Sequence, residues 1–187
     1  MASAVSRESY VRTGLDVLAD LGYGGLKLAG VCHRLGVTTG SFYHYFPSWS
    51  AYTGDLIHYW HGVRETSISG ICAQPDPRKR IGAFIQTALE LPHGTEAAIR
   101  AWSSIDPMVR VVQSAVDQRR FDVLLAAATE ILDDKHHAQV FASWAMYLLI
   151  GYEQSTLPLP TEDLAWIGAQ LLDALDSDRF TSLPDVG

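Results

Sequence analysis

The chain has 187 residues, of which 48% are hydrophobic and 19% are charged, a composition typical of a globular protein with a sizeable core. Its formal net charge of −7 argues against a surface that coats nucleic acid or an anionic membrane as a whole, although a local nucleic-acid-binding face stays compatible with it. Two cysteines are too few for a disulfide framework, and we expect a cytoplasmic protein with no signal peptide and no transmembrane helix.

The N-terminal part predicts one long and two short helices. The first is expected over 6–21, where Ser6 is a suitable N-cap and Gly22-Tyr23-Gly24-Gly25 marks the end. Short helices follow over 28–35 and 39–45. The turn between them, Gly36-Val37-Thr38, ends in a residue whose hydroxyl can cap the second short helix.

The rest of the chain predicts longer helices, because proline and glycine cluster between apolar periodic segments. These helices are expected at about 48–70, 78–91, 95–104, 107–132, 136–153 and 161–176. No alternating strand pattern occurs, so the sequence predicts an all-α fold of about nine helices.

The charge balance shifts along the chain. Residues 1–54 carry four basic and three acidic side chains, whereas the rest carries ten and eighteen. This shift indicates a near-neutral head followed by an acidic body.

The third predicted helix and the residue after it carry four phenylalanine or tyrosine rings in five consecutive residues, Phe42 to Phe46, so these rings must point to different sides. Phe42 and Phe46, at i and i+4, can pack inward on apolar residues of the preceding helices, Leu18, Val31 and Leu35. Tyr43 and His44 then face outward. Two short helices joined by a tight turn after a longer helix have the outline of a helix-turn-helix, whose second short helix enters the DNA major groove.

Residues 10–52 resemble the N-terminal motif of the TetR family of bacterial transcriptional regulators. The resemblance rests on Gly22-Tyr23, on Val31 and Leu35, and on the continuous stretch GVTTGSFYHYFPS over residues 36–48. It implies a three-helix DNA-binding head over 1–47 and an effector-binding and dimerisation body over 48–187.

The resemblance also implies how such a protein works. It would be a homodimer joined through its last two helices, bound to a palindromic double-stranded DNA operator and released by a small-molecule effector. The expected function is therefore a ligand-responsive transcriptional regulator, most simply a repressor, with no membrane partner.

The expected DNA contacts lie on the outward face of the third helix and on its flanks. Hydroxyl and imidazole groups can reach phosphates or base edges, and a glycine lets the helix approach the duplex closely. Trp49 stands where the family commonly has a lysine. The predicted set is Thr38, Thr39, Gly40, Ser41, Tyr43, His44 and Trp49. The plainer alternative is a capped surface helix with incidental aromatics.

An effector pocket is expected where apolar and aromatic residues of the body helices meet, as in the resembling family. The candidates are Trp60, Phe84, Trp102, Met108, Phe121, Phe141, Trp144 and Tyr147. The alternative for each of them is an ordinary core residue.

Two histidine pairs, His58 with His61 and His136 with His137, raise the question of a metal site. No carboxylate or thiolate pattern accompanies them, so pocket or surface histidines are the favoured interpretation. No nucleophile elbow, phosphate-binding glycine loop or CxxC motif occurs either. We therefore expect no enzyme, no metal and no cofactor, with a helical metalloenzyme as the alternative to test.

Three residues depart from the family pattern and motivate a rival function. Leu26 stands where the family often has a capping threonine, and Gly30 weakens the second helix by ~1 kcal/mol relative to alanine. Trp49 removes a charged phosphate contact, and a neutral donor releases no counterion. The rival is a helical small-molecule-binding protein with a weakened or vestigial DNA-binding head.

Overall fold

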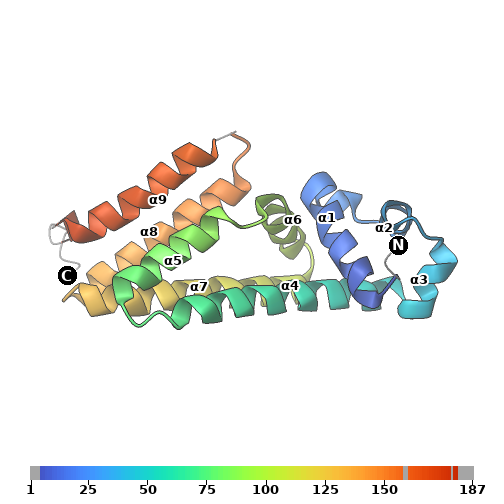
Figure 1. Cartoon of the computed structure of the whole chain (residues 1–187), viewed down its shortest axis with the longest axis horizontal. Coiled ribbons are helices and arrows are strands. Elements are labelled where there is room, and N and C mark those ends of the chain that lie inside the picture. The colour runs from blue at the N-terminus through green and yellow to red at the C-terminus, as the bar shows by residue number, and fades with distance from the viewer. Residues whose placement is uncertain (1–4, 158–159, 178, 181–187) are drawn as a thin grey trace. The chain divides into compact units, whose positions relative to one another are not determined.

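The computed structural model describes residues 5–157, 160–177 and 179–180. These residues form nine helices and no strand, which confirms the all-α prediction (Figure 1). The helices are α1 (Arg7–Gly25), α2 (Leu28–Leu35), α3 (Thr39–Tyr45), α4 (Trp49–Cys72), α5 (Pro77–Leu89), α6 (His93–Ser103), α7 (Pro107–Ile131), α8 (Lys135–Gln154) and α9 (Thr161–Asp176). The last residues of the expected body, 181–187, lie outside the described part.

The described residues pack into two units. The first contains the chain up to Arg64 together with Pro92–Ser114, and we call it the head unit. The second contains Glu65–Leu91 and the described residues from Ala115 onward, and we call it the body unit. The functional division expected at residues 47 and 48 concerns which residues bind DNA and which bind an effector, and it stays a prediction.

Helix α1 begins where its sequence predicts, but it continues to Gly25, beyond the end expected at residue 21. The Ser6 hydroxyl accepts a hydrogen bond from the backbone N–H of Ser9 at 3.1 Å, and the Ser9 hydroxyl reaches back to complete a capping box. At Gly22 the backbone leaves helical geometry with a φ of 65°, a conformation that glycine adopts without steric cost. One further turn, Tyr23–Gly25, follows this kink.

Helix α6 packs against α1 within the head unit. A side chain at Gly94 would place its Cβ only 2.6 Å from the carbonyl oxygen of Ala19, so the two backbones approach too closely for any other residue. The Thr95 hydroxyl donates to the carbonyl oxygen of Leu15 at 3.2 Å. The rings of Tyr23 and Trp102 stack with centroids 4.7 Å apart. These contacts attach α6 to the predicted DNA-binding helices.

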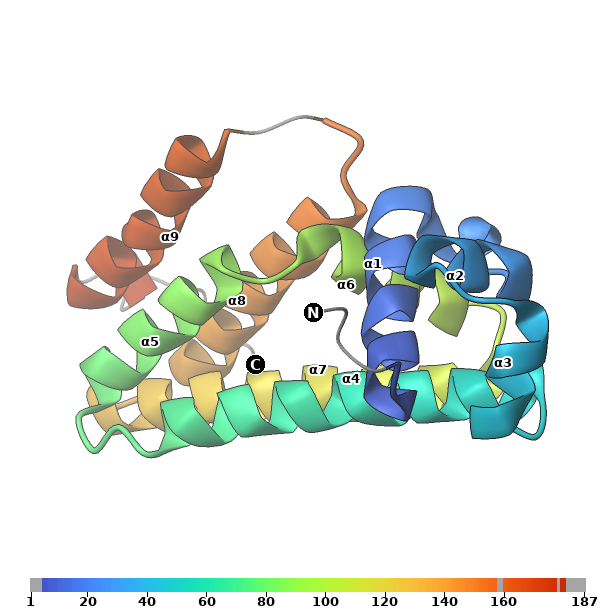
Figure 2. The same ribbon diagram turned by 45° about the vertical axis from the view of Figure 1, so that its right-hand side comes forward.

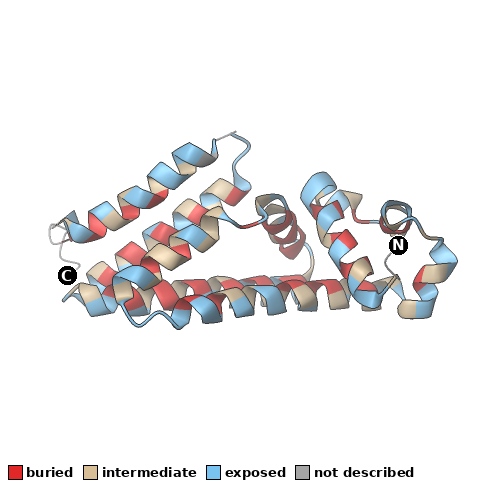
Figure 3. Ribbon diagram, in the orientation of Figure 1, coloured by how far each residue is buried: buried red, intermediate tan, exposed pale blue. Residues whose placement is uncertain are grey.

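The body unit has a continuous apolar core to which α4, α5, α7, α8 and α9 all contribute. Phe141 of α8 is fully buried, and its ring meets that of Phe180 edge-on at 5.6 Å. Helix α5 lies beside α9 in both views of the ribbon (Figures 1 and 2). Figure 3 marks the buried positions of these helices in red. Apolar burial on this scale supplies the main driving force for folding of the unit.

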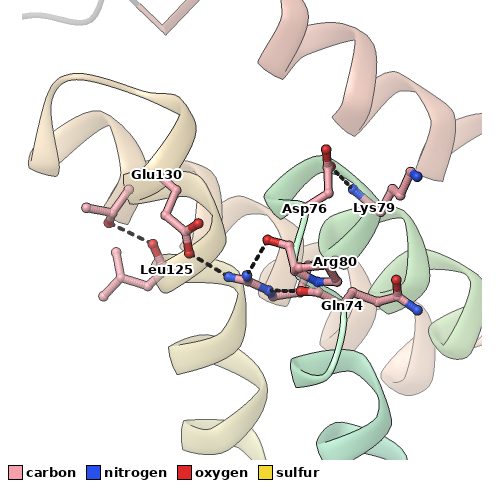
Figure 4. Close-up of polar contacts among 8 residues, drawn as sticks. Gln74, Asp76, Lys79, Arg80, Leu125 and Glu130 are labelled. Carbon is pink, nitrogen blue, oxygen red and sulfur yellow. Dashed lines mark hydrogen bonds and ion pairs between the residues drawn. The ribbon is translucent and has the colours of Figure 1, made fainter.

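Arg80 fixes the turn between α4 and α5 to the end of α7 (Figure 4). Its guanidinium donates to the carbonyl oxygen of Gln74 at 3.1 Å and to the carboxylate of Glu130 at 2.7 Å. Asp76 caps α5 by accepting from the backbone N–H of Lys79 at 2.9 Å. The turn is therefore held by charge-assisted hydrogen bonds.

The close approach at Gly94 generates a stability prediction. Gly94→Ala should lower the free energy of unfolding by about 1–3 kcal/mol, because the new Cβ must push α6 away from the α1 backbone. Chemical denaturation followed by circular dichroism measures the change.

The matched control is Gly82→Ala in α5, where a new Cβ would meet no atom within 4 Å. This variant should be neutral or gain up to ~1 kcal/mol from helix propensity. Equal effects of the two substitutions would contradict the described packing of α6 on α1.

Candidate functional site

The turn before α3 has the geometry that the sequence predicts. Gly36 takes a left-handed conformation with a φ of 72°, and its N–H donates to the carbonyl oxygen of His33 at 3.1 Å, which closes the end of α2. The Thr38 hydroxyl accepts from the backbone N–H of Ser41 at 3.2 Å. The cap predicted for α3 is therefore confirmed, and it satisfies an otherwise unpaired donor of this short helix.

An aromatic cluster holds α3 in place. Phe42 and Phe46 have no solvent exposure, as their i and i+4 spacing predicts. Tyr10 of α1 meets both rings edge-on at 5.7 Å, and Tyr52 of α4 meets them at 5.4 and 5.0 Å. Edge-to-face pairs of this kind stabilise by about 0.5–1.5 kcal/mol each beyond their area burial.

Tyr52 fits into this cluster because α1 has a glycine opposite it. A Cβ at Gly14 would lie 2.1 Å from the Tyr52 hydroxyl oxygen, so only glycine leaves room for the ring. The Tyr52 hydroxyl donates to the carbonyl oxygen of Tyr10 at 2.9 Å. Burial, and after it the neighbouring Cys32, raises the pKa of the Tyr52 phenol above its ordinary value of 10.

The end of α3 is tied to the start of α1. The Tyr45 hydroxyl donates to the carbonyl oxygen of Val5 at 2.8 Å, and Arg7 donates to the carbonyl oxygen of Tyr45 at 3.0 Å. Arg7 also pairs with Asp55 of α4 at 2.6 Å and covers the Phe46 ring at 4.7 Å. One arginine thus links the three helices that surround the aromatic cluster.

The predicted DNA contacts divide into two groups. Thr38, Thr39, Gly40, Tyr43 and His44 are exposed, and Tyr43 is 57% accessible. Ser41 is half-buried, and its hydroxyl oxygen accepts from the Tyr10 hydroxyl at 3.1 Å. Trp49 is also half-buried, with its ring 4.9 Å from that of Tyr52. Ser41 and Trp49 therefore help to position the helix as well as border its exposed face.

The ion pairs of the head unit draw attention to Lys27, which is not among the DNA contacts predicted from the sequence. Arg7, Arg12 and Arg34 form ion pairs with Asp55, Glu8 and Asp20 respectively. Lys27 lies exposed at the N-cap position of α2, and within the described residues no ion pair includes it. Sequence alone gives no signal for this difference, because the carboxylates that pair with Arg7 and Arg34 lie far away along the chain.

The eight residues predicted for an effector pocket are distributed over both units. Trp60, Trp102 and Met108 belong to the head unit, and the other five belong to the body unit. Phe84 and Phe141 are part of the buried body core, and Phe121 packs against it. Trp60 is buried and donates to the Glu96 carboxylate at 2.7 Å, and Glu96 is itself only 1% exposed.

A cavity of about 370 Å³ lies entirely within the head unit, and we call it the head cavity. One wall is a face of α4 made by Ser50, Thr53, Gly54, Ile57, His58 and His61. The opposite wall comes from the end of α6 and the start of α7, with Trp102, Asp106, Met108, Val109 and Val112. Two predicted pocket residues, Trp102 and Met108, are thus brought together with the two histidines of α4.

A second cavity, of about 400 Å³, lies on α8 in the body unit. Its walls are His136, Gln139, Val140, Ser143, Trp144 and Tyr147. Trp144 and Tyr147 are 37% and 71% exposed, so these two predicted pocket residues lie on the surface of the described chain.

The histidines do not gather with other ligand types. Within the part of the chain that the structure describes, no three His, Cys, Asp or Glu side chains are placed to hold a metal ion. The same residues include no helix that is long and apolar enough to span a membrane.

Comparison with known proteins agrees with this geometry. Residues 11–49 match the model for the bacterial regulatory proteins of the tetR family. This segment contains α2 and α3 and most of α1. No curated protein matches the chain.

Solved structures share the fold over nearly the whole chain. A transcriptional regulator from Rhodococcus sp. Rha1 is 18% identical, with a TM-score of 0.72 over 91% of this chain and 96% of that one. A candidate regulator from Saccharomonospora viridis, solved with choline, is 13% identical, with a TM-score of 0.75 over 89% and 95%. FadR from Bacillus subtilis, solved with stearoyl-CoA, is 16% identical, with a TM-score of 0.60 over 91% and 97%.

The raised pKa of Tyr52 generates a prediction about alkaline stability. The folded state holds the Tyr52 proton more tightly than the unfolded chain does. The contribution of this proton to the free energy of unfolding is therefore complete below about pH 10 and is lost as the pH rises above that value. Above about pH 10 the free energy of unfolding should fall by up to ~1.4 kcal/mol per pH unit from this group. Urea denaturation from about pH 8 to about pH 11 measures the slope.

Tyr52→Phe should flatten this slope, because it removes the phenol whose pKa burial raises. An identical alkaline slope in the wild type and in Tyr52→Phe would show that Tyr52 does not hold its proton as the buried geometry requires.

Proposed function

We propose that the chain is a ligand-responsive, DNA-binding transcriptional regulator of the TetR type, most simply a repressor, as the match of residues 11–49 to the tetR family model supports. It binds a palindromic operator as a homodimer and leaves the operator when a small-molecule effector binds. The proposal rests mainly on how α3 is held in the structure. A seven-residue helix is capped, anchored on buried aromatic rings and left with its other face exposed.

The proposed interface uses this exposed face. Thr38 and Thr39 offer hydroxyl groups at the start of α3, and Tyr43 and His44 offer polar groups one turn further along. A Cβ at Gly40 would meet only the Thr38 hydroxyl, at 3.6 Å. Because Gly40 has no side chain, nothing projects from the helix at this position and the DNA backbone can approach closely. Ser41 and Trp49 complete the set as contacts that also hold the helix.

The charges of the head unit favour modest, local attraction to DNA. Three of the four basic side chains in residues 1–54 form ion pairs, and Lys27 is the one of these four that no ion pair of the described residues includes. Its place at the N-cap of α2 adds the positive end of a helix dipole to its own charge. We therefore propose Lys27 as a phosphate contact.

The effector is proposed to bind in the part of the chain behind the DNA-binding helices, in keeping with the division at residues 47 and 48. Two proteins of the same fold were solved with choline and with stearoyl-CoA, which shows that this architecture accommodates chemically different ligands. A regulator of this kind acts in the cytoplasm, where it meets its operator, and needs no cofactor.

Dimerisation is proposed to use α8 and α9. Trp144 and Tyr147 on α8 and Trp166 on α9 are exposed apolar side chains, and Trp166 is 64% accessible. Such exposed aromatic side chains on the last two helices support an interface there, provided that they form one contiguous patch in the dimer. A two-fold axis through such an interface would present two copies of α3 to successive major grooves.

Selection from a random double-stranded DNA library tests the proposed function directly. The full-length protein should enrich a palindromic sequence, and affinity for that sequence should fall with rising salt concentration. Lack of enrichment at low salt would favour the rival, a helical ligand-binding protein with a vestigial head. Stoichiometric metal in chelator-free protein would instead reopen the metalloenzyme alternative.

Lys27 provides a quantitative prediction on the selected duplex. Lys27→Ala should weaken binding by a similar factor for all sequences and reduce the steepness of the salt dependence by about one counterion. Lys79→Ala, which removes the same charge from the body unit, is the matched control and should leave the salt dependence unaltered. Identical salt slopes for Lys27→Ala and the wild type would rule out the phosphate contact.

Trp166 provides a prediction on the oligomeric state. Trp166→Glu should shift sedimentation of the protein from dimer toward monomer, because a charged group would be buried without a partner in the interface. Met108→Glu, at an exposed apolar side chain of the head unit, is the control and should sediment as the wild type does. If both variants stay dimeric, α9 is not the interface.

A further inference from the structure

The head cavity has one polar wall and one apolar wall. The α4 wall carries the hydroxyls of Ser50 and Thr53 and the imidazoles of His58 and His61. The opposite wall is mainly hydrocarbon and is formed by Met108, Val109 and Val112, with Trp102 beside them. A volume of about 370 Å³ lies near the lower end of the range typical of small-molecule sites.

Gly54 creates the hollow at the centre of the α4 wall. It lies in the interior of a 24-residue helix, where glycine costs up to ~1 kcal/mol relative to alanine. Ser50, His58 and His61 lie four residues before it and four and seven residues after it, so all of them share its helix face. A Cβ at Gly54 would meet no atom within 4 Å, so the space over this residue is open.

The carboxylate of Asp106 is already engaged by the protein. One of its oxygens accepts from the backbone N–H of Met108 at 2.9 Å and of Val109 at 3.4 Å, which caps α7. The other accepts from the indole N–H of Trp102 at 3.2 Å. The group thus shapes the wall, and its negative charge disfavours an anionic occupant. Donors for a ligand come mainly from the histidine wall.

From this arrangement we infer that the head cavity is a binding site for a small, uncharged, mostly apolar molecule that carries a hydrogen-bond acceptor. The acceptor faces His58, which is exposed on the cavity wall, and the apolar part lies against Met108, Val109 and Val112. The space over Gly54 holds the centre of the molecule.

A ligand in the head cavity can affect the predicted DNA-binding helices through Trp102. Trp102 lines the cavity and also stacks on Tyr23, next to the kink of α1 at Gly22. A molecule that shifts Trp102 therefore acts on the contact that holds α6 to α1. This regulatory consequence rests on the proposed function, whereas the binding site itself does not.

A fluorescence titration of the full chain with prodan tests the site. Prodan is an uncharged naphthalene ketone, so it has the proposed combination of an apolar body and one acceptor, and its emission shifts to the blue in apolar surroundings. The wild type should bind it saturably. Gly54→Leu fills the hollow without a backbone clash and should raise the Kd at least about tenfold.

Two further variants complete the test. Gly62→Leu adds the same side chain to the same helix at another position with open space, outside the cavity walls, and should bind prodan as the wild type does. His58→Phe removes the donor while it keeps a ring in place, and should weaken binding several-fold.

Absence of saturable binding to the wild type, or equal Kd values for Gly54→Leu and Gly62→Leu, would overturn the inference. The titration contains no DNA, so its result is independent of the library selection. A chain that binds prodan at Gly54 but selects no DNA would retain this site and lose the proposed regulatory function.

Discussion

Phe42 of α3 and Phe46, which directly follows this helix, lie without solvent exposure between Tyr10 of α1 and Tyr52 of α4. The exposed face of α3 that is proposed to contact DNA depends on this packing. A helix of seven residues is too short to be stable in water by itself, so its position must come from tertiary packing. The aromatic rings supply that packing on one side. The opposite side is thereby left to hydroxyl, phenol and imidazole groups that are free to meet a duplex.

The same helices explain how a distant segment of the chain joins the head unit. Helix α6 follows α4 and α5 in sequence, yet it packs against α1 because Gly94 permits a backbone approach that no other residue would. Trp102 then stacks on Tyr23 and also lines the head cavity. The chain thus places a candidate ligand site and the predicted DNA-binding helices in a single packing unit.

Local signals in the sequence were sufficient for the helices and their caps. Ser6 and Thr38 cap as expected, and Phe42 and Phe46 point inward, because each of these features depends on residues within four positions of one another. Contacts between residues far apart in the sequence could not be predicted from such local signals. The partnership of Tyr52 with Gly14, the stacking of Trp102 on Tyr23 and the ion pairs that leave Lys27 available all depend on helix packing, which local periodicity does not encode.

Hydroxyl-radical footprinting on a selected duplex is the most direct measurement of the central claim, that two anchored copies of α3 read DNA together. Two protected segments are expected on one face of the duplex, with centres separated by about one helical turn, ~34 Å, or a multiple of it. Protection should weaken at both segments in Tyr43→Ala, which keeps the buried side of α3 intact. A single protected segment, or equal protection by the wild type and Tyr43→Ala, would contradict DNA recognition by two copies of α3.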